Sequence, residues 1–321
     1  MIRSVRRLTL VAGPVLVLAA CATEPVVDTA APAPVEAPAA NSPLLEDVRI
    51  LSADDMEGRD IGAPGGERAG AYIVSRMEAM GVAPAPFGRL QPFEATGRTR
   101  EGPKTFNGTN IVGLIPGTRV PDRYIVVTAH YDHVGVNNGQ IYNGADDNAS
   151  GVATMLELAR RLKAQAPEHS VLIVALDGEE RGLLGAKEFV KAPPVPLTSM
   201  SVNVNFDMVS RAETDGHLWV TGAYQNPYLR PILEPIPANG AVSLAFGKDT
   251  PQDKEEDNWV DASDHAAFHD AGVPFLYFGV DYHPDYHRPS DDFERITPSV
   301  FISAAELAIE SFHRLDRALD R

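Results

Sequence analysis

Cysteine is almost absent from this sequence of 321 residues, in which Cys21 is the only one. One cysteine excludes an internal disulfide, and it also excludes a metal site built from several thiolates. Basic residues are scarce as well, because 28 Lys and Arg oppose 44 Asp and Glu and the formal net charge is −16. Proteins bind nucleic-acid phosphates through Lys and Arg, so we expect no nucleic-acid partner.

Long apolar runs are also lacking, with one exception near the amino terminus. Three arginines precede an apolar run from Leu8 to Ala20, which predicts a signal peptide over residues 1–20 because the run is too short to span a bilayer. The junction Leu18-Ala19-Ala20-Cys21 resembles a bacterial lipoprotein signal. We therefore expect an exported protein that a lipid on Cys21 anchors to the cell-envelope membrane, facing the periplasm. Ordinary cleavage nearby, with an incidental cysteine, is the alternative.

Residues 21–44 combine this cysteine with a stretch rich in Ala and Pro and poor in large side chains. Such a stretch cannot bury a core and is typical of a semi-extended tether. The remaining residues, 45–321, have the length of one larger α/β domain. We predict that this domain carries the function.

Apolar runs of strand length alternate with helical patterns along this domain. The runs predict strands at 110–114, 124–129, 170–176, 201–206, 217–221, 241–246 and 273–278. The patterns predict helices at 45–56, 69–80, 149–164, 182–191, 226–236, 263–270 and from Pro298 onward. This alternation predicts an α/β fold: a three-layer α/β/α sandwich around a mostly parallel mixed sheet. Residues 247–260 are charged and aperiodic, which indicates a surface loop or the wall of a cleft.

Side chains that bind metals follow four of the predicted strands. His130 and Asp132 follow the second strand, and residues 177–180, Asp-Gly-Glu-Glu, follow the third. Asp207 follows the fourth, and residues 281–287, which include two histidines, follow the last. Ligands bind outside the carboxyl ends of parallel strands, so these groups are expected to converge. Nitrogen and oxygen donors without sulfur suit zinc, or manganese or cobalt.

Six short motifs contain these side chains and some of their neighbours: His130-Tyr131-Asp132, Gly144-Ala145-Asp146-Asp147-Asn148-Ala149-Ser150-Gly151, Asp177-Gly178-Glu179-Glu180, Asn205-Phe206-Asp207-Met208, Ser263-Asp264-His265 and Tyr286-His287-Arg288-Pro289-Ser290-Asp291. In this order they resemble the motifs of the co-catalytic dizinc exopeptidases. That family includes bacterial zinc aminopeptidases and relatives of glutamate carboxypeptidase, and this chain would be a lipoprotein member.

The resemblance implies two Zn²⁺ ions and a ligand set. His130 and Asp207 would bind one metal, Glu180 and His287 would bind the other, and Asp147 would bridge both. In relatives the bridging Asp precedes a cis peptide bond, which makes the bond between Asp147 and Asn148 a candidate. Residues 45–321 would then be a metallopeptidase catalytic domain.

Glu179 is the candidate general base. A carboxylate that lies beside a ligand without binding the metal can take a proton and pass it on. An adjacent Glu pair also occurs simply as favourable charge at a helix amino terminus. Three other strand ends also carry side chains that could bind a metal, and this favours the catalytic interpretation for Glu179.

Other residues have supporting roles in the resemblance. Asp132 would accept the second ring N–H of His130 and so fix its tautomer. Tyr286 would donate a hydrogen bond to the oxyanion of the transition state, or else serve only in packing. Asp264 would support the ligands from behind or pack in the core. We expect three further histidines to be core or surface residues that bind no metal: His133, His269 and His283.

We therefore predict a metal-dependent exopeptidase, with aminopeptidase as the first expectation and peptides as substrates. The resemblance implies that a hydroxide shared by the two metals attacks the peptide carbonyl while Glu179 carries the proton. A glutaminyl cyclase with one zinc is the nearest alternative. A carboxypeptidase would use Arg211 or Arg288 to bind the terminal carboxylate, and a silent peptide-binding protein should have lost a ligand or the base. The sequence leaves the oligomeric state open.

Overall fold

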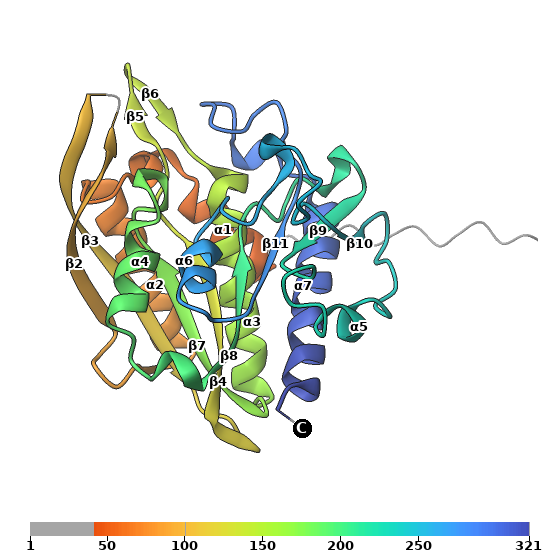
Figure 1. Ribbon diagram of the computed structural model, residues 1–321. Helices are drawn as coiled ribbons and strands as arrows, with labels where there is room; N and C mark the ends of the chain where they lie inside the picture. The colour runs from red at the N-terminus through yellow and green to blue at the C-terminus, as the bar shows by residue number, and fades with distance from the viewer. Residues whose placement is uncertain (1–41, 100, 321) are drawn as a thin grey trace, which may run out of the picture. The chain divides into compact units, whose positions relative to one another are not determined.

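The computed structural model describes residues 42–99 and 101–320 (Figure 1). The predicted signal peptide, Cys21 and almost all of the predicted tether lie outside the described residues. Within these two ranges, no helix combines the length and the apolar character needed to cross a membrane.

The described chain contains seven α-helices, and most of them match a predicted helix. α2 ends before Gly81, whose φ of +68° is the left-handed conformation that glycine commonly adopts just after a helix. α7 begins at Pro298 after Thr297, as predicted. The helices are α1 (Pro43–Leu51), α2 (Pro64–Ala79), α3 (Gly151–Ala164), α4 (Leu184–Lys191), α5 (Arg230–Leu233), α6 (His265–Asp270) and α7 (Pro298–Ala318).

Nine of the described strands form one mixed sheet, and two more form a separate hairpin, β5–β6. The order in the sheet is β1-β3-β7-β4-β8-β11-β9-β10, and β2 pairs with β3. The strands are β1 (Ala83–Pro84), β2 (Leu90–Thr99), β3 (Gly102–Ile115), β4 (Val120–His130), β5 (Gly135–Asn137), β6 (Gln140–Tyr142), β7 (His169–Leu176), β8 (Met200–Phe206), β9 (His217–Thr221), β10 (Ser243–Phe246) and β11 (Phe275–Gly279).

The four central strands, β7, β4, β8 and β11, run parallel to one another. Antiparallel pairings occur on both sides of them, where β3 joins β7 and β9 joins β11. The predicted mixed sheet is thus confirmed, and its parallel part is the centre. Because the central strands share one direction, their carboxyl ends lie at one edge of the sheet, where the predicted ligands follow.

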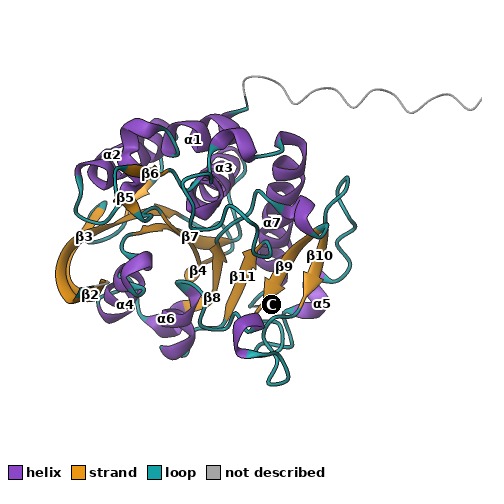
Figure 2. Ribbon diagram, turned by 90° about the horizontal axis from the view of Figure 1, so that it is seen from above, coloured by secondary structure: helices purple, strands orange, loops and turns teal. Residues whose placement is uncertain are grey.

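Helices cover both faces of the sheet, as the predicted three-layer sandwich requires. Figure 2 shows α1, α2, α3 and α7 on one face and α4 and α6 on the other. Every residue of β7 is buried. Its side chains alternate between two apolar cores, with Val171, Ile173 and Ala175 in one and Leu172, Val174 and Leu176 in the other. Burial on both faces explains the uninterrupted apolar run of this strand.

Some elements differ from the predictions. The predicted helix over 45–56 ends at Leu51, and a separate turn follows over Asp54–Arg59. The long hairpin formed by β2 and the first part of β3 was not predicted. β2 contains Pro92 and Gly97, and one of its faces is only partly buried. Such a strand is tolerated at the edge of a sheet, but it gives no apolar signal in the sequence.

Candidate metal centre

The carboxyl ends of the four central strands deliver the predicted ligands to one place. His130 is the last residue of β4, and Asp207 follows β8 directly. Glu179 and Glu180 lie three and four residues after β7. His287 comes from the long loop after β11. The structure therefore brings together side chains that are up to 157 residues apart in the sequence.

Asp147 lies between two groups of donor atoms and faces one with each carboxylate oxygen. Its Oδ1 lies 3.4 Å from His130 Nε2, which is 3.2 Å from Asp207 Oδ1. Its Oδ2 lies 2.9 Å from His287 Nε2, which is 3.2 Å from Glu180 Oε1. These separations are those of ligands on a shared ion, and the arrangement matches the bridging role that the resemblance implied for Asp147.

His133 joins the second group, although we had predicted that it binds no metal. Its side chain is fully buried, and its Nδ1 lies 2.8 Å from Glu180 Oε1 and 3.7 Å from Asp147 Oδ2. The four donor atoms of His133, Asp147, Glu180 and His287 lie within 4.8 Å of one another. His133 is thus a core histidine, as predicted, but it is also a candidate fourth ligand.

The donor atoms of these groups fit a bound cation. His133 Nδ1 and Glu180 Oε1 lie 2.8 Å apart without the geometry of a hydrogen bond, and like His133 Nε2 they have no other hydrogen-bond partner within the described chain, although all three atoms are buried. Buried polar atoms without partners are costly, and a cation between them removes that cost. The donors are imidazole nitrogens and carboxylate oxygens, and both are common ligands of zinc in proteins. Each group is therefore a candidate site for a metal ion.

Asp147 is held in place through its main chain. The N–H groups of Asp146 and Asp147 donate to the Asp291 carboxylate at 3.1 Å. A cis peptide bond joins Asp147 to Asn148, which confirms the expectation from the resemblance. The Asn148 side chain donates to Phe206 O and accepts from Gly151 N and Met208 N, which ties this turn to the end of β8.

Asp132 supports the site differently from the prediction. Its main-chain oxygen, not its carboxylate, is the partner of His130 Nδ1 at 3.1 Å, because the nearest carboxylate oxygen is 3.7 Å away. The carboxylate instead accepts the main-chain N–H of Glu179 at 3.0 Å and that of Glu180 at 3.2 Å. Asp132 therefore positions the candidate base and a candidate ligand together.

Glu179 lines the small cavity beside both donor groups. Its carboxylate makes no hydrogen bond to any other described residue. Burial raises the pKa of Glu179 well above its usual range, and the negative charges of Glu180, Asp264 and Asp207 raise it further while His130 lowers it. A carboxyl group that is not a ligand and has a raised pKa has the properties of a proton carrier.

Tyr286 also lines this cavity, and its ring stacks on that of His287 with 3.9 Å between ring centres. Burial raises the pKa of the Tyr286 hydroxyl, and the negative charges of Asp147 and Glu180 add to the effect, so the hydroxyl stays a donor. Asp264 is completely buried behind the site, and neither of its carboxylate oxygens has a hydrogen-bond partner among the described residues. Burial raises the pKa of Asp264 to about 8.

The two other histidines lie apart from the donor groups, as predicted. His283 is buried and its Nε2 lies 3.0 Å from Asp146 Oδ2. Asp146 also accepts hydrogen bonds from the main chain and side chain of Ser210, so it orders the loop around the site. His269 packs edge-on against Phe275.

Arg59 is a structural residue of the site that the sequence did not reveal. Its side chain is 1% exposed and donates to four main-chain oxygens, those of Leu51, Tyr131, Asn143 and Gly144. Burial lowers the pKa of Arg59 to about 10, while the carboxylates of the metal centre oppose this shift. Arg59 thus fastens both ends of the loop 131–144 to the end of α1.

Replacing Arg59 by Met is expected to lower the free energy of unfolding by about 3 kcal/mol, because buried carbonyl groups would lose their donors. Urea unfolding followed by circular dichroism measures the change. Arg68→Met is the control, since Arg68 is exposed and pairs with Glu57 at the surface. Equal unfolding midpoints for the two variants would contradict the role given to Arg59.

The fold and the two donor groups define an α/β protein with a candidate two-metal centre. The model of peptidase family M28 matches residues 110–312, which is more than half of the chain and includes both donor groups. The chain belongs to peptidase family M28.

Comparisons of this chain with individual proteins agree with the assignment to this family. Aminopeptidase YwaD of Bacillus subtilis is 32% identical over 212 residues, which are 62% of this chain and 42% of YwaD. The chain spans less than half the length of the curated relatives it matches. The crystal structure of BSAP, a zinc aminopeptidase from Bacillus subtilis, has a TM-score of 0.66 at 20% identity and covers 84% of this chain and 93% of its own. A Bacteroides thetaiotaomicron glutaminyl cyclase has a TM-score of 0.64 at 18% identity, covering 84% and 96%. Both structures share the fold.

Proposed function

We propose that this protein is an aminopeptidase that uses two zinc ions to release residues from the amino end of peptides. The observation that carries the proposal is the arrangement around Asp147. Two donor groups share this one carboxylate, and Glu179, which belongs to neither group, lines the same cavity. Mn²⁺ or Co²⁺ would suit the same nitrogen and oxygen donors.

The charge of the cavity favours an amino end over a carboxyl end as the bound group. No Lys or Arg is among the residues that line the cavity at the metal centre. An adjoining cavity shares Ala262 and Tyr282 with it and is lined by acidic residues of the segment 249–261. Arg211, one of the two candidate anchors for a carboxylate, already pairs with Asp285 at 3.0 Å. A substrate ammonium group is attracted to such surroundings, and a substrate carboxylate is repelled.

The chain's own residues would divide the work of hydrolysis. Two bound zinc ions would supply Lewis-acid polarisation of the scissile carbonyl and a lowered pKa for water. Glu179 would take a proton from the attacking water and deliver it to the leaving nitrogen, so it is protonated only between the two transfers. Asp132 would hold Glu179 in position through its main chain. The buried rings of Trp259 and Tyr277, which line the cavity, would limit access of bulk water.

Tyr286 would donate its hydroxyl hydrogen to the developing oxyanion. Tyr286→Phe is therefore expected to lower kcat on the order of 10²-fold with little change in KM, because the lost hydrogen bond forms only in the transition state. Steady-state kinetics on an amino-acid nitroanilide measures both constants. Unchanged kcat in Tyr286→Phe would reduce Tyr286 to a packing residue on His287.

A glutaminyl cyclase is the second candidate, because solved cyclases share this fold. Such an enzyme closes an amino-terminal Gln to pyroglutamate and releases ammonia instead of hydrolysing a peptide bond. The arrangement here gives each oxygen of Asp147 its own set of partners, which favours two ions over one. The two candidates predict different products and different metal contents.

A substrate panel tests the proposal on the purified full chain. Leucine nitroanilide, its N-acetylated form, an N-blocked dipeptide and a peptide that begins with Gln would each be incubated with added zinc. We expect hydrolysis of leucine nitroanilide and at least a 10²-fold slower reaction after acetylation. Cleavage of the N-blocked dipeptide would indicate a carboxypeptidase, and ammonia release from the Gln peptide would indicate a cyclase.

We also propose that the protein is exported and anchored to the cell-envelope membrane by a lipid on Cys21, with the enzyme facing the periplasm. The sequence at Leu18–Cys21 supports this proposal. Mass spectrometry of the mature amino terminus after expression in a bacterial host tests it. A lipidated cysteine as first residue is expected, and Cys21→Ser should release the protein from the membrane fraction. An unmodified Cys21, or membrane attachment that survives Cys21→Ser, would refute the anchor.

A further inference from the structure

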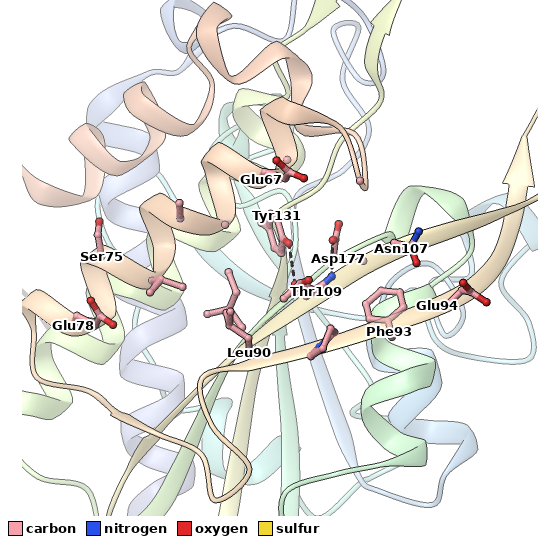
Figure 3. Close-up of a pocket in the computed structure, with 18 residues that line it drawn as sticks. Glu67, Ser75, Glu78, Leu90, Phe93, Glu94, Asn107, Thr109, Tyr131 and Asp177 are labelled. Carbon is pink, nitrogen blue, oxygen red and sulfur yellow. Dashed lines mark hydrogen bonds between the residues drawn. The ribbon is translucent and has the colours of Figure 1, made fainter.

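A second cavity lies between helix α2 and strands β2 and β3, and Figure 3 shows its lining. Its volume is about 1010 Å³. It shares no lining residue with the cavity at the metal centre. It nevertheless lies close by, because Tyr131 follows His130 and Asp177 precedes Glu179 by two residues. We refer to it as the α2–β2 cavity.

The floor of the α2–β2 cavity is an apolar patch of sheet that no other part of the described chain fills. Leu90 of β2 pairs with Ile111 of β3, and Leu90 is 52% exposed. The facing side of α2 carries Gly66, Gly70 and Val74 at four-residue steps, which places them on one helix face. A Cβ atom on Gly70 would lie 3.6 Å from Ile111 and from the Tyr131 hydroxyl. Gly70 therefore lets α2 lie close to Ile111 and Tyr131 at this point, and a larger side chain there would fill part of the cavity.

A buried carboxylate with a free oxygen lies at the inner end of this cavity. Asp177 is 4% exposed, and one of its oxygens accepts the main-chain N–H of Thr109 at 2.9 Å. The other oxygen, Oδ1, has no hydrogen-bond partner within the described ranges. The Tyr131 hydroxyl donates to Thr109 O instead, as Figure 3 shows. Burial, with the nearby Asp132, raises the pKa of Asp177 to about 8, although the Thr109 N–H and the Tyr131 hydroxyl oppose this shift, so a positive charge beside Asp177 would favour its ionised form.

The charged residues that line the α2–β2 cavity are all acidic. Glu67 and Glu78 come from α2, Glu94 comes from β2, and Asp177 lies at the inner end. No Lys, Arg or His is among the lining residues of this cavity. Four carboxyl groups around an apolar floor select a ligand that joins a positive charge to an apolar body.

We propose that the α2–β2 cavity binds small primary ammonium compounds with an apolar body, with the ammonium group on Asp177 and the apolar part on the exposed Leu90. A primary ammonium group donates three hydrogen bonds, which satisfies the free oxygen of Asp177 and adds the missing positive charge. The ligand is either a free amine or the amino end of a peptide with an apolar first residue. Both sources present the same chemistry to this cavity.

The test is an NMR titration of the metal-loaded full chain with 2-phenylethylammonium and, separately, with the neutral 2-phenylethanol. Methyl signals of Leu90 and Ile111 report the α2–β2 cavity, and those of Val280 report the metal centre, whose cavity it lines. We expect 2-phenylethylammonium to shift the Leu90 and Ile111 signals in a saturable way. We expect 2-phenylethanol to bind at least tenfold more weakly. Equal binding of the two compounds, or shifts confined to Val280, would overturn the proposal.

Substitutions test which carboxyl group binds the ammonium group of the ligand. Asp177→Asn keeps an acceptor for Thr109 N–H but loses the charge, and it should weaken binding of 2-phenylethylammonium at least tenfold. Glu234→Gln removes one exposed negative charge that lines neither cavity and should change the affinity less than twofold. If Asp177→Asn does not fold, Glu67→Gln at the exposed rim should still weaken binding about threefold. Unchanged affinity in Asp177→Asn, or in Glu67→Gln where the first variant fails, would contradict the proposal.

The same titration separates the two sources of the ammonium group. The peptide Phe-Gly-Gly would be added to Glu179→Gln, in which hydrolysis is expected to be slow. Binding of both the amine and the peptide at Leu90 and Ile111 would define an accessory site for peptide amino ends. Binding of the amine alone would define a site for free amines. Absence of both would refute the proposal.

Discussion

Glu179→Gln is expected to lower kcat on leucine nitroanilide by about 10³-fold while the protein keeps its bound metal ions. The amide has nearly the same size as the carboxyl group but cannot take up a proton, and general acid–base catalysis contributes about 10²- to 10⁴-fold in enzymes. Glu179 is not among the donor groups and its main-chain N–H bond to Asp132 is unaffected by the change. Steady-state kinetics and metal analysis on the same preparation measure both properties.

Glu188→Gln is the matched control for this experiment. Glu188 lies on α4 and pairs with Lys191 at the surface, so its replacement should leave both kcat and metal content unchanged. If Glu179→Gln loses metal together with activity, Glu179 is a ligand or a support for the ligands. If it keeps both, another group carries the proton. Either result would remove Glu179 from its proposed role.

Several of the candidate ligands could be predicted because they follow apolar strands. His130, Asp207 and the Glu179–Glu180 pair come directly after runs that only a sheet buried on both faces explains. Parallel strands bring such positions to one edge whatever their separation in the sequence. Asp147 follows no predicted strand and His287 lies further from its strand, and only the resemblance to a known family singled out these two as ligands.

His133 and Arg59 could not be predicted, for two physical reasons. Residues three apart in an extended strand point to opposite faces, so the pattern around His130 gives no sign that His133 reaches the same centre. The strand ends at His130, however, and the chain turns, which returns His133 to the same centre. Arg59 lies in a polar turn that is typical of the surface. Its burial depends on four main-chain oxygens, which leave no pattern of side chains in the sequence.

The α2–β2 cavity was equally beyond prediction from the sequence. Its floor depends on the pairing of Leu90 with Ile111, and β2 has no apolar alternation that would reveal it. The acidic residues of α2 look like an ordinary solvated helix face when the sheet opposite is unknown. Only the position of Asp177 in the structure shows that one carboxyl group points inward and has an oxygen without a hydrogen-bond partner.

Asp147→Asn is expected to lower the metal content by more than one equivalent, because one side chain serves both donor groups. Its Oδ1 faces His130, and its Oδ2 faces His287, so the amide would replace one charged oxygen and weaken the whole bridge. His130→Ala should instead affect only the group that contains Asp207. Metal analysis after dialysis against buffered zinc compares the two variants with the unaltered protein, for which we expect two equivalents.

Thermal unfolding with and without a chelator gives an independent measure of how much metal binding depends on Asp147. A ligand that binds only the folded state at about 100 times its Kd stabilises that state by about 2.7 kcal/mol. Chelation should therefore lower the Tm of the unaltered protein by several degrees and that of Asp147→Asn by much less. One equivalent of zinc in the unaltered protein would favour the cyclase over the aminopeptidase. Two equivalents retained in Asp147→Asn would show that the two sites are filled independently, and the shared carboxylate would then not be what unites them.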